Sequence, residues 1–354
     1  MPWVSHRGDT SVAVRPHLFT LPGLGWEIQG YGLFLALALL LAWGLTLSFG
    51  RKDRLPPGPL GTAFVLASGL GLVGARIGWI LQRPGDTGAG IELFALRSDE
   101  LAPFVGVTVA AIVGGLYLMR RRIPAVAGYD VAAPAFMAAL MVERLGALMA
   151  GTGYGRVAPE LPWAIRFPAG SPAFIEHQRT LTAMFPIDAT ESLPVHPTQI
   201  YGLLVAGAAL WVGLWLRKRR TYSGQVVLGT LITYLLGRSF IEEWFRADAA
   251  GASLGPLSSG QVAAVVLAAS MVVIMRARAA LAVHRPAEFR PWEGGRWTPA
   301  ELRDPSKGPD KPGPSASRSH TGSNRSVTSG ASRRRKTKAK HKGKRGKKQR
   351  RKKK

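Results

Sequence analysis

Charged residues interrupt the apolar segments of this chain at positions where a membrane-spanning helix usually carries none. Glu143 and Arg144 lie inside one such segment, and Arg76 lies inside another. A charge at membrane depth costs at least about 2.5–3.5 kcal/mol, so it is rare and usually faces a polar interior. Because guanidinium groups bind phosphate through paired hydrogen bonds, converging arginines predict a phosphate-bearing ligand. The alternative is that Glu143 and Arg144 mark a helix end at the interface, capped by the glycines that follow.

A second group of polar residues lies near the C-terminal end of the apolar segment 224–245. Tyr234, Arg238 and Glu242 are spaced four apart, so they share one face of a helix, and Glu243 and Arg246 follow them. The alternative is a structural clamp, in which Arg238 and Glu242 satisfy each other within their own helix. Since the arginines outnumber the glutamates at these depths, we expect an anion to complete the balance.

His196 stands directly before Pro197, at the start of another apolar segment. Proline is favoured in the first turn of a helix, which places the imidazole at a helix N-terminus near the membrane surface. The helix dipole there lowers the pKa of a histidine and favours the neutral ring, which is able to act as a general base. The alternative is an interfacial histidine that only caps the helix.

The composition indicates a membrane protein. The 354 residues are 47% hydrophobic, and the apolar residues are bunched rather than periodic. The chain has no cysteine, so disulfides, thiolate metal sites and a cysteine nucleophile are excluded. We expect neither a metal nor a cofactor. The first apolar run ends in Gly50-Arg51-Lys52 rather than at a cleavage site, so it is expected to stay as a spanning helix.

Seven apolar segments are long enough to cross a bilayer, which needs about 20 residues. They are 31–49, 61–81, 101–119, 125–150, 197–216, 224–245 and 256–275. Basic clusters follow the first, third, fifth and seventh, whereas the loops after the others are poorer in Lys and Arg. The positive-inside rule then places the N-terminus in the periplasm and the C-terminus in the cytoplasm.

The sequence predicts an all-α, polytopic membrane fold in three parts. An N-terminal periplasmic or interfacial segment covers 1–30, the seven-helix domain covers 31–281 with a periplasmic insertion at about 151–195, and a low-complexity tail covers 282–354. From Glu301 onward the tail has 21 Lys/Arg and 3 Asp/Glu, so it carries 18 of the 26 net positive charges. Such a run is expected to be disordered and to contact anionic lipid, with nucleic-acid binding as the less favoured alternative.

The motifs in their order resemble the prolipoprotein diacylglyceryl transferase family from about Leu18 to Ala280. The histidine motif at 196–201 is the most specific match, and the order and spacing of the short matches add to it. The matching stretches are LFTLPGLGW at 18–26, GAR at 74–76, DVAAP at 130–134, RLG at 144–146, YGR at 154–156, LPWA at 161–164, HPTQIY at 196–201 and LSSGQ at 257–261.

The resemblance implies a bacterial inner-membrane enzyme that transfers diacylglyceryl from phosphatidylglycerol to the lipobox cysteine of a preprolipoprotein. By family position, Arg144 and Arg238 hold the phosphate, Tyr31 and Tyr234 orient lipid head groups, and His196 orients or deprotonates. We expect catalytic roles for Arg144, Arg238 and His196, and substrate contacts from Tyr31, Arg76, Glu143, Gly155, Gln199, Tyr201, Tyr234, Glu242 and Arg246.

Several positions depart from the family pattern. Phe104 stands where the family usually has a histidine, and an apolar ring takes no proton from a thiol. Gly202 stands where a glutamate usually follows the histidine motif, and Ala147, Ala150 and Thr152 replace polar residues of the signature. The interval from Arg238 to Arg246 is also one residue longer than expected.

These departures leave three hypotheses. The first is an active transferase in which His196 or an acidic side chain moves the proton. The second is a degenerate homologue that binds phospholipid or prolipoprotein without turnover. The third, a transporter or channel, is disfavoured because the chain has no internal repeat, which many transporters have.

Overall fold

The computed structural model describes residues 17–20, 27–82, 101–186, 188–247, 253–254 and 257–289. The chain divides into two units, Met1–Pro309 and Asp310–Lys354, and every described residue belongs to the first. Most of the predicted N-terminal segment, residues 83–100 and the basic tail from residue 290 lie outside the described residues. The division into three parts at 30 and 281 therefore stays a prediction.

Six described helices are long and apolar enough to cross a membrane. They are α1 (Gly30–Lys52), α2 (Pro57–Gln82), α3 (Pro103–Arg120), α4 (Ala125–Ala150), α6 (Thr198–Arg219) and α8 (Ser259–His284). The other regular elements described are short: α5 (Pro172–Thr180), α9 (Pro286–Phe289) and two antiparallel pairs, β1 (His17–Thr20) with β2 (Glu27–Gln29) and β3 (Ser253–Leu254) with β4 (Leu257–Ser258). The predicted all-α, multi-pass class is confirmed.

The remaining predicted span is helical but irregular. It consists of α7 (Gln225–Gly237), a π-helical turn η2 (Arg238–Glu242) and a 3₁₀ turn η3 (Glu243–Phe245), which follow one another without a break. α7 alone has 13 residues, or about 20 Å at 1.5 Å per residue, which is less than the hydrocarbon core of about 30 Å. The exact number of seven spans therefore stays a prediction. A π-turn absorbs one extra residue in a helix, which agrees with the longer interval between Arg238 and Arg246 that the resemblance indicates.

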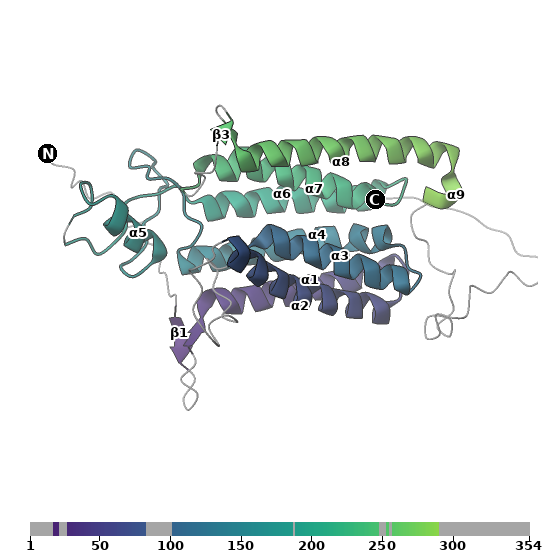
Figure 1. The fold of residues 1–354 in the computed structure, drawn as a ribbon, viewed down its shortest axis with the longest axis horizontal. Helices are drawn as coiled ribbons and strands as arrows, with labels where there is room; N and C mark the ends of the chain where they lie inside the picture. Colours follow the sequence, from purple (N-terminus) through teal and green to yellow (C-terminus); the bar gives the residue numbers. More distant parts are fainter. Residues whose placement is uncertain are drawn as a thin grey trace, which may run out of the picture. The chain divides into compact units, whose positions relative to one another are not determined.

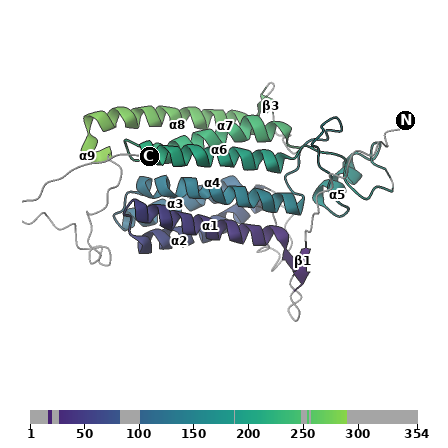
Figure 2. The same cartoon turned by 180° about the vertical axis from the view of Figure 1, so that it is seen from behind.

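The long helices run side by side (Figures 1 and 2). α4 packs on α1, α6 and α7, while α2 packs on α3 and α7 packs on α8. The α2–α3 contact is made by small residues: a Cβ at Gly78 would lie 2.8 Å from Val105, and one at Gly106 would lie 2.8 Å from Ala75. Small residues let helix backbones approach closely in a membrane, where lipid supplies no hydrophobic drive for association. α3 is therefore held in a fixed position on α2.

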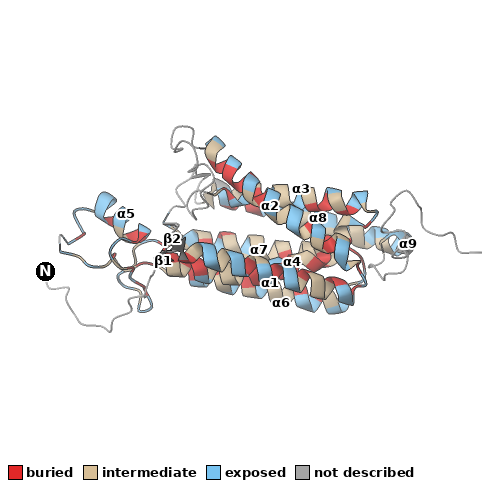
Figure 3. Ribbon diagram, turned by 90° about the horizontal axis from the view of Figure 1, so that it is seen from below, coloured by how far each residue is buried: buried red, intermediate tan, exposed pale blue. Residues whose placement is uncertain are grey.

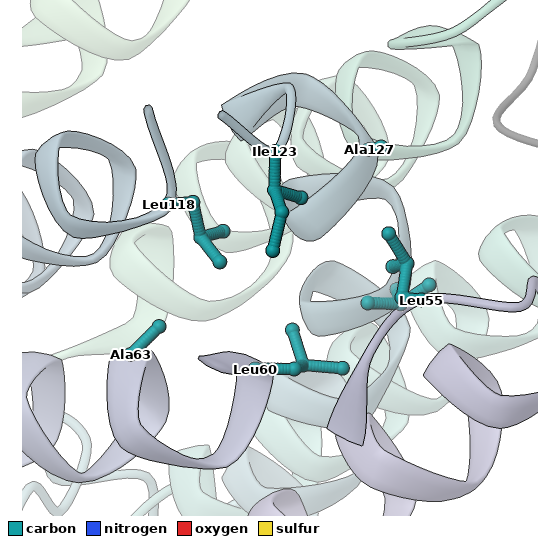
Figure 4. Close-up of a cluster of buried hydrophobic side chains, with 7 residues drawn as sticks. Leu55, Leu60, Ala63, Leu118, Ile123 and Ala127 are labelled. Carbon is teal, nitrogen blue, oxygen red and sulfur yellow. The ribbon is translucent and has the colours of Figure 1, made fainter. Parts of the chain in front are cut away.

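Buried and exposed residues alternate along the helices (Figure 3). The largest buried apolar cluster lies where α2, α3 and α4 meet (Figure 4), and it includes Leu60, Leu118 and Val131. In contrast, α8 exposes Val266, Leu267 and Val273. An apolar surface of that extent suits a bilayer rather than water.

Ion pairs tie the helices together at the end where α6 finishes. Asp53, just after α1, accepts hydrogen bonds from Arg217 at 3.0 Å and from Arg220 at 2.8 Å. Asp130 of α4 accepts from the backbone N–H groups of Gly224 and Val227, at 2.7 and 2.9 Å, at the start of α7. Two residues of the basic cluster that follows the predicted fifth span therefore have a structural role.

Candidate active site

One buried carboxylate collects three guanidinium groups. Oε1 of Glu242 lies 3.0 Å from Arg144 Nη2, 3.2 Å from Arg238 Nη1 and 3.6 Å from Arg246 Nη1. Glu242 is 1% exposed. α4 supplies the first arginine, while η2 and the residue after η3 supply the others, so the site forms only when these elements pack together. Arg144 and Arg238 converge, as the sequence predicts.

Glu143 and two tyrosines complete this arginine cluster. Tyr31 on α1 donates its hydroxyl to Glu143 Oε1 at 3.2 Å, and Glu143 Oε2 lies 3.6 Å from Arg144 Nε. Tyr234 on α7 also hydrogen-bonds to the Arg144 guanidinium. Among the described residues, the cluster thus joins three arginines to two glutamates. Guanidinium groups gathered in this way suit a phosphodiester anion.

The π-turn decides which of two adjacent glutamates enters the cluster. Glu242 points to the arginines, whereas Glu243 Oε1 accepts a 2.7 Å hydrogen bond from Ser258 Oγ just before α8. Gln261 of α8 donates to the carbonyl of Ser239 inside the π-turn at 2.8 Å. The side chains of Ser258 and Gln261 thus hold the carboxylate of Glu243 and a backbone carbonyl of the π-turn. The turn in this position places Glu242 and Arg238 against α4.

A short backbone assembly connects the arginine cluster to the predicted histidine. Gly151, with φ of 68°, ends α4 in the left-handed conformation that glycine adopts freely. The chain then returns so that Gly155 N donates to the His196 carbonyl at 3.1 Å and Arg156 N donates to the Phe245 carbonyl at 2.8 Å. A Cβ at Gly155 would lie 2.6 Å from His196 Cβ and 2.7 Å from two carbonyl oxygens. Only glycine fits this position.

His196 is held by three aromatic side chains. Tyr201 Oη lies 3.2 Å from His196 Nδ1 and accepts a 3.0 Å hydrogen bond from Trp163 Nε1. The imidazole also packs on Phe245, with ring centroids 4.6 Å apart. Burial, followed by the nearby positive charge of Arg156, lowers the pKa of His196 and favours the neutral ring.

This arrangement bears on which nitrogen of His196 carries the proton. An indole N–H only donates, so Trp163 occupies a lone pair of the Tyr201 oxygen. A phenol hydroxyl is the better donor and an imidazole nitrogen the better acceptor, so the paired geometry favours donation from Tyr201 to Nδ1. The neutral ring then carries its hydrogen on Nε2 and presents a donor. The contacts therefore favour an orienting role over that of a base.

Two further predicted residues lie apart from these contacts. Gln199 is buried and donates from Nε2 to the Thr152 carbonyl at 2.8 Å, so it braces the turn after α4. Arg76 is buried on α2 with its guanidinium 4.9 Å from the ring centroid of Trp79. A direct substrate contact for either residue stays a prediction.

Four further residues contact the site in ways that the sequence did not predict. Phe245 and Trp163 support His196, as described above. A Cβ at Gly202 would lie 2.9 Å from both Arg144 Nε and Glu242 Oε2, so its missing side chain leaves room for that ion pair. The ring of Phe104 lies 5.5 Å from Arg238 Cζ. Aromatic residues in a membrane sequence are too common for the first two to be recognised without the fold.

The sequence profile of the prolipoprotein diacylglyceryl transferase family matches residues 16–277 of this chain. The chain belongs to this family. The match begins before α1 and ends within α8, so it contains the whole arginine cluster and the histidine assembly. It confirms the resemblance that the motifs indicate.

Individual members of the family support the same assignment. The chain is 32% identical to the phosphatidylglycerol–prolipoprotein diacylglyceryl transferase of Verminephrobacter eiseniae, over 74% of this chain and 92% of that protein. It is 29% identical to the protein of that name from Geobacter sulfurreducens, over 70% and 89%. For the one from Thermus thermophilus the values are 30% identity over 62% and 81%. The chain thus covers most of the length of each relative.

Proposed function

We propose that this chain transfers the diacylglyceryl group from phosphatidylglycerol to the lipobox cysteine thiol of a preprolipoprotein. The observation that carries the proposal is the meeting of Arg144, Arg238 and Arg246 on a single oxygen of Glu242. Charged residues at membrane depth are rare and commonly mark the path of a charged substrate. Phosphatidylglycerol is an anion that reaches this depth within the lipid.

The cluster suits the leaving group of this reaction. The cysteine sulfur forms a bond to the glyceryl carbon while the bond from that carbon to the phosphate oxygen breaks. The thiol proton ends on the phosphate or in the solvent, and glycerol phosphate leaves. Negative charge therefore develops on an oxygen beside Arg144 and Arg238, where fixed positive charge in a poorly hydrated site is most effective. Tyr31 and Tyr234 hold Glu143 and Arg144 in position for this.

The histidine assembly is assigned to the thiol-bearing substrate. His196, Tyr201 and Gly155 lie at the end of the arginine cluster where the insertion returns, near the start of α6. A donor on Nε2 of His196 suits a peptide carbonyl or a phosphate oxygen. In this assignment His196 orients the substrate, and Gln199 keeps the turn that carries Gly155 in place.

The sequence and the family support a membrane location for this reaction. The chain is a multi-pass bacterial membrane protein. We assign it to the inner membrane, where phosphatidylglycerol and preprolipoproteins meet. In this proposal its N-terminus lies in the periplasm and its C-terminus in the cytoplasm, which the basic clusters support. There the Lys/Arg-rich tail meets anionic lipid, at about 1 kcal/mol for each basic residue near the surface, in preference to nucleic acid.

The test uses purified full-length protein, phosphatidylglycerol and a lipobox peptide. We expect a thioether-linked lipopeptide and an equal amount of glycerol phosphate. The gene should also restore lipoprotein modification in cells depleted of their own transferase. Retention of phosphatidylglycerol with no release of glycerol phosphate, and loss of that retention in Arg144→Ala, would instead establish binding without turnover.

A further inference from the structure

Phe104 lies in an unusual place for an apolar side chain. It is 64% exposed near the start of α3, yet its ring centroid is 5.5 Å from Cζ of Arg238. The ring thus lies over a guanidinium of the arginine cluster while most of its surface stays exposed. Among apolar side chains, an aromatic ring attracts a cation, because its face carries partial negative charge.

The ring is presented by a rigid part of the fold. The residue before α3 donates its backbone N–H, Ala102 N, to the Ala75 carbonyl of α2 at 2.9 Å. One turn farther on, Gly106 approaches the α2 backbone so closely that a Cβ would lie 2.9 Å from the Gly71 carbonyl oxygen. Arg238, in contrast, starts a π-turn, which is less regular than an α-helix. Phe104 therefore comes from the fixed side of this contact.

The contact constrains the direction in which Arg238 offers its hydrogen bonds. The N–H groups of a guanidinium lie in the plane of the group. An aromatic ring attracts a cation through the face of the ring. Arg238 uses Nη1 in that plane for Glu242 at 3.2 Å. The guanidinium is thus held at two points, with Cζ over the Phe104 ring and Nη1 on Glu242. This restricts the directions in which its other N–H groups point, as two-point recognition of a phosphate requires.

We propose that Phe104 is a positioning residue for Arg238, which it orients toward the phosphate of phosphatidylglycerol by a cation–π contact. The inference rests on the proposed transferase function. It also assigns a role to the position where the histidine of the family is replaced. The ring takes no proton, and its contribution is made through Arg238.

The decisive experiment changes the charge of the ring without changing its size. Full-length protein is prepared with phenylalanine, monofluoro-, difluoro- or trifluorophenylalanine at position 104, because each fluorine weakens the negative ring face. We expect kcat/KM to fall stepwise with each fluorine, reaching a total loss of about 2- to 30-fold. Phe104→Trp should retain activity within about threefold, since indole binds cations best, while Phe104→Leu should resemble the trifluoro variant.

A matched control is Trp211→Leu, which removes an exposed aromatic side chain from α6 and should leave kcat/KM unchanged. If the wild-type protein turns over and all fluorinated variants match it, Phe104 only fills space and the inference is overturned while the transferase function stands. A uniform loss in the Trp and Leu variants with no fluorine trend also overturns it. An inactive wild-type protein would overturn the proposed function and this inference with it.

Discussion

Replacing Glu242 with glutamine removes one negative charge and keeps the shape of the side chain. The structure makes this the most informative single change, because Oε1 is shared by Arg144, Arg238 and Arg246. Removal of the charge makes the cluster more positive by one unit. We expect Glu242→Gln to separate lipid binding from turnover.

The magnitudes follow from burial and geometry. Taking one partner from a buried ion pair costs about 3–5 kcal/mol of stability, because it leaves uncompensated charge. Phosphatidylglycerol partly restores the balance, so the variant should bind the lipid at least as tightly as the wild type. The arginines then lose their common anchor, and misplacing one donor to the leaving group costs about 10²–10³ in kcat. We expect a loss of kcat in that range with KM for the lipid unchanged or lower.

The assay is release of glycerol phosphate, measured over a range of phosphatidylglycerol concentrations at fixed lipobox peptide. Lipid that co-purifies with the protein gives an independent measure of binding. Glu243→Gln is the control, since Glu243 is the adjacent acid but its carboxylate accepts from Ser258 outside the cluster. Wild-type kcat in Glu242→Gln, or an equal loss in Glu243→Gln, would refute the role of the shared carboxylate.

Three further variants test other parts of the structure. Gly155→Ala places a Cβ 2.6–2.7 Å from His196 and two carbonyl oxygens. It should lower the free energy of unfolding by about 1–3 kcal/mol, measured as a lower unfolding temperature in detergent. Turnover should fall at least about tenfold. Asp53→Asn leaves two arginines without their carboxylate and should cost about 3–5 kcal/mol, while turnover per folded molecule stays unchanged. Burial lowers the pKa of His177 below its usual value of about 6.5. As the pH falls, the unfolded chain therefore binds the proton before the folded protein does. The free energy of unfolding decreases below about pH 6.5 until the pH has passed the pKa of the folded protein. His177→Asn keeps an acceptor for Leu193 N, so its unfolding temperature should depend less on pH between 5 and 7; an equal slope in both proteins contradicts this.

The spans were predictable because lipid imposes long apolar helices. The predicted segment at 125–150 coincides with α4, and the other five long helices overlap their predicted segments. The segment at 224–245 was predicted as a regular span, and its π-turn was not foreseen. A π-turn leaves no clear mark in composition. The sequence feature that agrees with it is the interval between Arg238 and Arg246, which is one residue longer than the resemblance implies.

The convergence of Arg144 and Arg238 was also predictable, since charges at membrane depth need polar partners. The spacing of four also predicted the pair of Arg238 and Glu242, but nothing in the sequence showed that Arg144 and Arg246 reach the same oxygen. The support of His196 by Trp163 was not predictable either. That contact joins the insertion to α6 across 38 residues, and no local signal records it.

The sharing of one carboxylate among three arginines is itself suited to catalysis. Without lipid, the guanidinium groups need a counter-ion, because isolated charges are too costly at this depth. Glu242 provides one through a single oxygen, at 3.0, 3.2 and 3.6 Å from the three arginines. This shared contact orders the arginines relative to one another, so that a phosphate meets them already gathered. Gly202 is needed for this arrangement, because a side chain there would contact both Arg144 and Glu242. The empty position on α6 lets a single glutamate from the π-turn reach the arginines and hold them ready for the phosphate.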